Sequence, residues 1–160
     1  MRISWVIGVG VAVFLGIMGL AFWSIERSSN EQGPSTQNEK LVVVTSFYPL
    51  TYLASAIGGD MISMTNITPA GSEPHDFEPS PREMISIGNA DLFIYNGADF
   101  EPWVAKWRAG GFEHPERILN MATALKGRNI KLIEGGHGID PHIWLDPLMM
   151  IEEAKIIRYA

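Results

Sequence analysis

The sequence of 160 residues contains no cysteine, which makes a lipid-modified N-terminal cysteine impossible. The redox compartment stays open, because a chain without cysteine suits oxidising and reducing surroundings alike. The sequence also lacks internal repeats, a glycine loop that could cradle phosphate, and a nucleophile set beside a base and its orienting group. The last two absences argue against an enzyme.

The sequence also has no excess of basic residues. The net charge is −6, and all of it falls on residues 41–160, because residues 1–40 carry three basic and three acidic side chains. This balance argues against a nucleic-acid partner and is compatible with attracting cations. An ordinary soluble surface explains the same charge, so the charge alone does not identify a ligand.

One long run without charge stands at the N-terminus. Residues 3–25 contain only two polar side chains, both serines, and as a helix they are long enough to cross a bilayer. The apolar core of a cleaved signal peptide is usually shorter, so we predict a retained transmembrane helix over residues 1–25, with a long signal peptide as the alternative. Arg2 places the short N-terminal end in the cytoplasm and the body outside it. Polar residues 26–40 predict a flexible tether.

Residues 41–145 alternate between strand-like and helix-like segments, which predicts an α/β lobe with a parallel sheet flanked by helices. The capping-box pattern from Ser80 to Glu83 predicts the start of one helix. Asp146 and Pro147 predict the start of another, with an apolar stripe of Leu148, Met149, Ile151, Ile156 and Ile157. The predicted strands are 41–47, 61–68, 91–96, 117–121 and 130–135, and the predicted helices before residue 146 are 50–57, 82–90 and 101–110.

Two histidines lie in loops whose backbones are restricted by proline. His75 falls in the loop from Pro69 to Glu83, and His142 precedes the terminal helix. Ligands of open α/β sheets bind beyond the carboxyl ends of the strands, and a stiff loop loses little entropy when it captures a metal. A lone histidine is more often an ordinary loop residue, because metal sites need several converging ligands.

Other polar residues admit two interpretations. His137, between glycines, is either an auxiliary metal ligand or a surface residue, whereas His114 is expected on the surface. Glu78 and Asp146 are expected to position loops, Glu78 by accepting hydrogen bonds from backbone amides. If the protein were instead a metal-dependent hydrolase, Glu78 would be the obvious general base.

Four segments together resemble the metal-binding receptors of zinc and manganese ABC importers: "VVTSFYPL", "PAGSEPHDFEPSP", "ADLFIYNG" followed by "EPW", and "DPHIWLDP". The resemblance runs from about Leu41 to Ala160. It implies two α/β lobes joined by a long helix, with the metal bound between them. It also implies that His75 and His142 are the metal ligands of the first lobe, and that residues 146–160 begin the inter-lobe helix.

The resemblance implies extracytoplasmic binding of a divalent metal and its delivery to an ABC permease. Zinc is favoured because imidazole suits it, whereas carboxylate-rich sites favour manganese, which stays the alternative. The match ends at Ala160, just after the last helix begins, so a truncated and non-functional fragment is a second expectation. A role in cell adhesion, ascribed to some relatives, is a lesser one.

Overall fold

The fold was analysed in a computed structural model that describes residues 39–111, 114–136 and 138–160. The predicted transmembrane helix over residues 1–25, nearly all of the predicted tether and His137 lie outside the described residues. Within the described ranges, none of the helices has the length and apolar character needed to cross a membrane.

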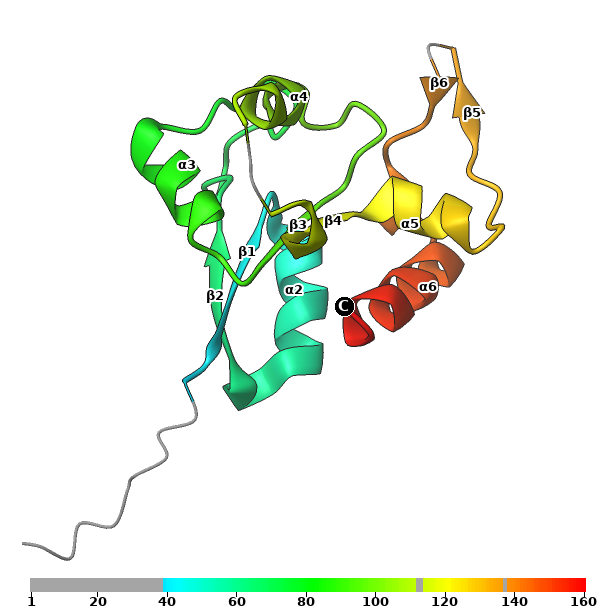
Figure 1. The fold of residues 1–160 in the computed structure, drawn as a ribbon. Coiled ribbons are helices and arrows are strands. Elements are labelled where there is room, and N and C mark those ends of the chain that lie inside the picture. The colour runs from blue at the N-terminus through cyan, green and yellow to red at the C-terminus, as the bar shows by residue number, and fades with distance from the viewer. Residues whose placement is uncertain (1–38, 112–113, 137) are drawn as a thin grey trace, which may run out of the picture. The chain divides into compact units, whose positions relative to one another are not determined.

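A four-stranded parallel sheet forms the centre of the lobe, in the strand order β2-β1-β3-β4. The strands are β1 (Leu41–Thr45), β2 (Ile62–Asn66), β3 (Leu92–Tyr95) and β4 (Ile118–Asn120). Val43 of β1 pairs with Met64 of β2 on one side and with Leu92 of β3 on the other. The predicted parallel α/β sheet is confirmed (Figure 1).

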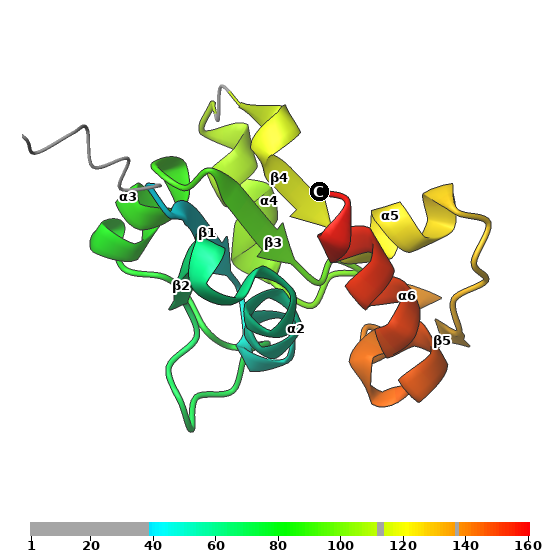
Figure 2. The same ribbon diagram turned by 90° about the horizontal axis from the view of Figure 1, so that it is seen from below.

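Helices cover the sheet on both faces, as Figures 1 and 2 show. Neighbouring strand residues point to opposite faces, so Val43 and Ile94 enter one core whereas Val44 and Phe93 enter the other. The first core is closed by α2 (Tyr48–Gly58), α5 (Met121–Gly127) and α6 (Pro147–Arg158), and the second by α3 (Pro81–Gly88) and α4 (Pro102–Ala109).

Two helix starts follow the predicted capping chemistry. The Ser80 side chain accepts a hydrogen bond from the Glu83 amide at 3.4 Å, while the Glu83 carboxylate accepts from the Ser80 amide at 2.6 Å. Asp146 accepts from the Leu148 amide at 2.8 Å and caps α6. Three short 3-10 turns complete the described elements: η1 (Gly59–Met61), η2 (Pro115–Arg117) and η3 (Ile143–Leu145).

The prediction of a strand over residues 130–135 is wrong. Only β5 (Glu134–Gly135) is extended there, and it pairs antiparallel with β6 (Gly138–Ile139) in a hairpin separate from the main sheet. Helix α5 was not predicted. It begins at Met121 because the Asn120 side chain accepts a hydrogen bond from the Thr123 amide at 2.9 Å and caps it.

The predicted apolar stripe of α6 is buried only in part. Leu148 and Ile151 are exposed, with 68% and 51% of their surface accessible, whereas Glu153 is completely buried together with Ile156 and Ile157. The buried face of α6 packs against α2 and α5. A carboxylate that the predicted stripe did not include therefore occupies a core position of α6.

Candidate metal centre

His75 lies in the loop between β2 and α3, and local contacts give this loop its shape. The backbone amide of Ser72 donates to the Pro69 carbonyl at 3.1 Å, and that of Asp76 to the Glu73 carbonyl at 3.3 Å. The Glu73 carboxylate accepts from the His75 amide, also at 3.3 Å. These hydrogen bonds stay within the loop, and the His75 side chain is half-buried.

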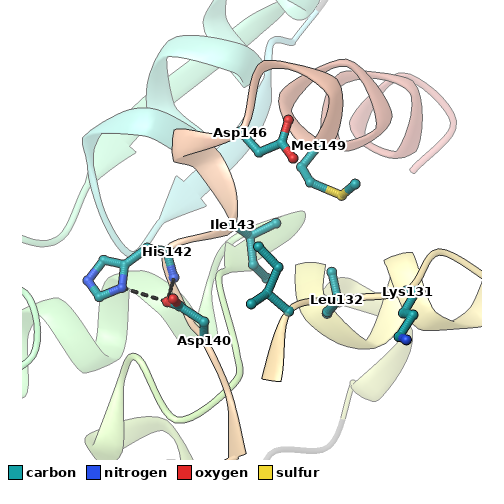
Figure 3. A pocket seen from close by; sticks show the side chains of 8 residues that line it. Lys131, Leu132, Asp140, His142, Ile143, Asp146 and Met149 are labelled. Carbon is teal, nitrogen blue, oxygen red and sulfur yellow. Dashed lines mark hydrogen bonds and ion pairs between the residues drawn. The ribbon is translucent and has the colours of Figure 1, made fainter. Parts of the chain in front are cut away.

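His142 lies between the β5–β6 hairpin and α6, and Asp140 orients it. One oxygen of Asp140, Oδ1, accepts from the His142 amide at 3.0 Å and lies 2.7 Å from Nδ1 of the ring (Figure 3). The backbone hydrogen bond and then the ring hydrogen bond lower the pKa of Asp140, so its carboxylate is ionised and can only accept. Nδ1 must therefore carry the proton, which leaves Nε2 of a neutral His142 free to bind a metal.

The two rings lie close together although 67 positions separate them in the sequence. Their centroids are 5.7 Å apart. Phe100 contacts both, with its centroid 4.4 Å from that of His75 and 6.4 Å from that of His142. Trp144 lies against His142 at 5.4 Å and against Phe100 at 4.9 Å. Aromatic packing thus holds the two imidazoles beside each other at the carboxyl edge of the sheet.

Among the described residues, the two imidazoles are the candidate metal ligands that meet at this edge of the sheet. Among residues 39–111, 114–136 and 138–160, no three histidine or acidic side chains gather closely enough to hold a metal ion. A tetrahedral zinc ion takes four ligands, so the pair supplies half of a coordination shell.

A hollow of about 140 Å³ lies beside His142. Asp140 and His142 line it from the segment before α6, and Asp146 and Met149 from the start of that helix (Figure 3). The Asp146 carboxylate is already engaged as the cap of α6. The other lining residues are Lys131, Leu132, Ile133 and Ile143.

Glu78 lies apart from this arrangement. Its carboxylate is 3.4 Å from Nζ of Lys106 on α4, with both side chains exposed, instead of accepting from backbone amides as expected. The pair borders a surface hollow lined by Trp103 and Trp107. Glu78 therefore ties its loop to α4, and no described contact places it beside either histidine as a general base.

His114 lies on the surface as expected, whereas two residues beside the candidate ligands were overlooked. His114 is exposed and lies 3.1 Å from Glu116, as a surface residue does, and His137 is outside the described residues. The sequence reasoning missed Asp140 and Phe100. An aspartate two positions before a histidine was a readable signal for Asp140, whereas Phe100 lies 25 positions from His75 and gave none.

The lobe is an open α/β sheet, and proteins of this class bind their ligands beyond the carboxyl ends of the strands, where His75 and His142 lie. The family model described as "Zinc-uptake complex component A periplasmic" matches residues 43–160, and the chain belongs to this family of metal-binding receptors of ABC importers.

Relatives support the same assignment. The high-affinity zinc uptake system protein ZnuA of Bacillus subtilis is 33% identical over 82% of this chain and 44% of its own length. The manganese-binding lipoprotein MntA of Halalkalibacterium halodurans is 30% identical over 89% of this chain and 46% of its own length. The chain spans less than half of these relatives, and their names cover both metals.

Solved structures share the fold. The metal-dependent lipoprotein YcdH of Bacillus subtilis superposes with a TM-score of 0.65 at 36% identity, covering 74% of this chain and 42% of that one. The Zn(II)-bound ZnuA-like domain of Streptococcus pneumoniae AdcA gives a TM-score of 0.65 at 31% identity, covering 75% and 43%.

Proposed function

We propose that this chain forms the first lobe of a receptor that binds a divalent transition metal outside the cytoplasm and delivers it to the permease of an ABC importer. His75 and His142 are the proposed ligands from this lobe. The observation that carries the proposal is the meeting of these two rings, 5.7 Å apart, from loops widely separated in the sequence.

The spacing of the rings suits a shared metal ion. Zinc–nitrogen bonds of about 2.1 Å imply ring centroids about 5 Å apart when two imidazoles bind one tetrahedral ion. The observed 5.7 Å is close to this value, so a small movement of either loop completes the pair. The bond to Asp140 fixes which nitrogen of His142 faces the metal.

Zinc is the proposed metal, with manganese as the alternative. Imidazole nitrogens suit zinc, whereas manganese prefers carboxylates and water. In this proposal a second lobe supplies the remaining ligands. The exposed Leu148 and Ile151 on α6 support it, because a helix that joins two lobes needs an apolar face for the second one as well.

Residues 3–25 are the proposed membrane anchor. The relative MntA is named a lipoprotein, whereas this sequence has no cysteine to carry a lipid. An uncharged helix of this length would retain the receptor at the outer side of the membrane. Protease added to intact spheroplasts is expected to digest residues 41–160, and protection of that segment would contradict the topology.

Calorimetric titration with Zn²⁺ tests the site. His75→Ala and His142→Ala are each expected to weaken zinc binding at least about tenfold, because each removes one of two ligands. His114→Ala is the control, since its exposed ring pairs with Glu116 away from the site. A parallel titration with Mn²⁺ tests the choice of metal. Equal losses in all three variants would refute the assignment. It would also be refuted if the unmodified chain bound no more zinc than a variant in which both His75 and His142 are replaced by alanine.

A further inference from the structure

A buried polar cluster links the two loops that carry the histidines. It consists of Ser46, Asn96 and Glu101, and we call it the polar hub. The three side chains are between 0% and 6% exposed. Ser46 follows β1, Asn96 follows β3, and Glu101 precedes α4, so the hub lies at the carboxyl ends of the two central strands.

Glu101 closes the loop between β3 and α4. Its carboxylate accepts from Oγ of Ser46 at 2.5 Å and from the backbone amides of Asn96 and Gly97 at 2.8 and 3.0 Å. The closed loop contains two left-handed residues in succession, Ala98 and Asp99, with φ angles of 53° and 59°. Such conformations persist only where surrounding contacts enforce them, and the carboxylate holds the loop at Asn96 and Gly97, directly before these two residues.

The shape of this loop decides where Phe100 lies. Phe100 is 2% exposed and is the residue directly before Glu101. Its ring makes the 4.4 Å edge contact with His75. The carboxylate of Glu101 therefore acts on His75 through the loop and the Phe100 ring, without touching the histidine.

Asn96 acts on the other histidine. Its side-chain nitrogen Nδ2 donates to the Gly97 carbonyl at 3.1 Å and to the Pro141 carbonyl at 2.8 Å. Pro141 is the residue before His142, so the amide ties the end of β3 to the segment that holds the second ring. The other amide atom, Oδ1, is buried without a hydrogen-bond partner among the described residues. That desolvated oxygen costs stability, which makes packing alone a poor reason for asparagine here.

We propose that Asn96 and Glu101 are positioning residues that set the distance between His75 and His142 from one buried hub. The inference rests on the proposed function for its purpose, because the distance between the rings matters only if they share a ligand. Removing an outer partner of a metal ligand typically costs 10- to 100-fold in affinity. We expect about a tenfold loss of zinc affinity for Asn96→Ala, because the segment that carries His142 loses its hydrogen bond to the end of β3.

The experiment combines zinc titration with NMR of the histidine rings in the whole chain. Asn96→Ala tests the tether to Pro141, and the isosteric Glu101→Gln tests the loop closure if the first variant does not fold. Asp91→Ala is the control. The Asp91 carboxylate accepts from the Val42 amide at 2.8 Å at the start of β3, the end of this strand opposite to Asn96.

The ring spectra give a readout that general destabilisation does not move. In the unmodified chain without metal, His142 should populate the tautomer protonated at Nδ1, held there by Asp140. Asn96→Ala should shift His142 toward the ordinary mixture of tautomers and leave His114 unchanged. Glu101→Gln should instead alter the ring environment of His75. Asp91→Ala should lower the melting temperature while both rings and the zinc affinity stay as they were.

Each outcome decides the proposal. An unchanged His142 ring and unchanged affinity in Asn96→Ala, or an equal loss in Asp91→Ala, would overturn it. If Asn96→Ala does not fold, Glu101→Gln is tested in its place. An unchanged ring spectrum of His75 and an unchanged zinc affinity in that variant would then overturn the proposal. If the unmodified chain binds no zinc, the proposed function fails, yet the tautomer comparison without metal still decides whether the hub positions the rings.

Discussion

Two buried glutamates show how differently the core treats the same side chain. Glu101, in the polar hub, is 6% exposed and accepts three hydrogen bonds. Glu153, on the buried face of α6, is 0% exposed, and neither of its oxygens has a partner among the described residues. Burial raises the pKa of both carboxyl groups, but hydrogen bonds oppose this only at Glu101.

The comparison teaches that burial alone does not define a structural role. At Glu101 the donors of the surrounding loop depend on the carboxylate, so the residue organises its neighbours. At Glu153 nothing described depends on the charge, and burial raises the pKa to about 7. The first glutamate holds the loop between β3 and α4 together, whereas the second is a cost to the lobe near neutral pH.

Glu101→Leu should have the largest effect. It leaves the hydroxyl of Ser46 and the amides of Asn96 and Gly97 buried without an acceptor, and each such group costs about 1–3 kcal/mol. The free energy of unfolding should fall by about 4 kcal/mol, measured by urea denaturation. A loss below 1 kcal/mol would mean that water replaces the carboxylate and that the two glutamates are alike.

Glu153 should make the stability depend on pH. The pKa of Glu153 rises from 4.5 to about 7 on folding, so the folded chain holds this proton more tightly than the unfolded chain. Its contribution is fully present below about pH 4.5 and is lost as the pH rises through about 7. The loss amounts to about 3 kcal/mol.

The measurement compares urea denaturation of the unmodified chain and Glu153→Gln at pH 5 and pH 8. The difference between their free energies of unfolding should change by about 2.5 kcal/mol in favour of the variant from pH 5 to pH 8, because part of the loss has already occurred at pH 5. Glu153→Met, which removes the polar group, should be the more stable chain at pH 8. A difference independent of pH would mean that Glu153 has an unseen partner.

Asp146→Ala should have a smaller effect, because this carboxylate is partly exposed and accepts one backbone hydrogen bond. Losing the cap of α6 typically costs about 1 kcal/mol. Asp146→Asn keeps an acceptor oxygen and should retain most of the stability in thermal denaturation. If the asparagine variant loses as much as the alanine variant, the charge and not the cap is responsible.

The exposed carboxylate of Glu78 should matter least. Its ion pair with Lys106 is 3.4 Å long, and the two side chains are 70% and 84% exposed. Pairs of this kind contribute roughly 0–1 kcal/mol, so Lys106→Ala should change the midpoint of thermal unfolding by little. A large loss of thermal stability would show that the loop between β2 and α3 depends on the ion pair with Lys106. Glu78 would then have a structural role like that of Glu101.

The fold was predictable from the sequence where local chemistry decided it. Apolar runs ended by proline or glycine marked β1, β2 and β3, and the capping box marked α3. The same reasoning failed at residues 130–135, because Ile130, Leu132 and Ile133 look like a strand although Ile133 is 70% exposed. A short apolar run does not reveal whether a neighbouring strand is available to pair with it.

The candidate site was predictable only in part. The prolines around His75 and the resemblance pointed to both histidines. The supports of the site were not visible, because the bond from Asn96 to Pro141 joins residues 45 positions apart. Glu153 was missed for a similar reason: a glutamate between Ile151 and Ile156 gives no sign of which face of α6 the other helices cover.

The strand order has a consequence for how the chain assembles. The pairing of β1 with β3 joins Val43 to Leu92, and chains dominated by such distant contacts fold slowly. Until that pairing forms, His75 and His142 lie on separate stretches of an open chain. A metal ion added during refolding therefore has no pair of rings to bind before the sheet is complete. Under the proposed function, zinc should slow the unfolding of the finished lobe and leave its rate of folding unchanged.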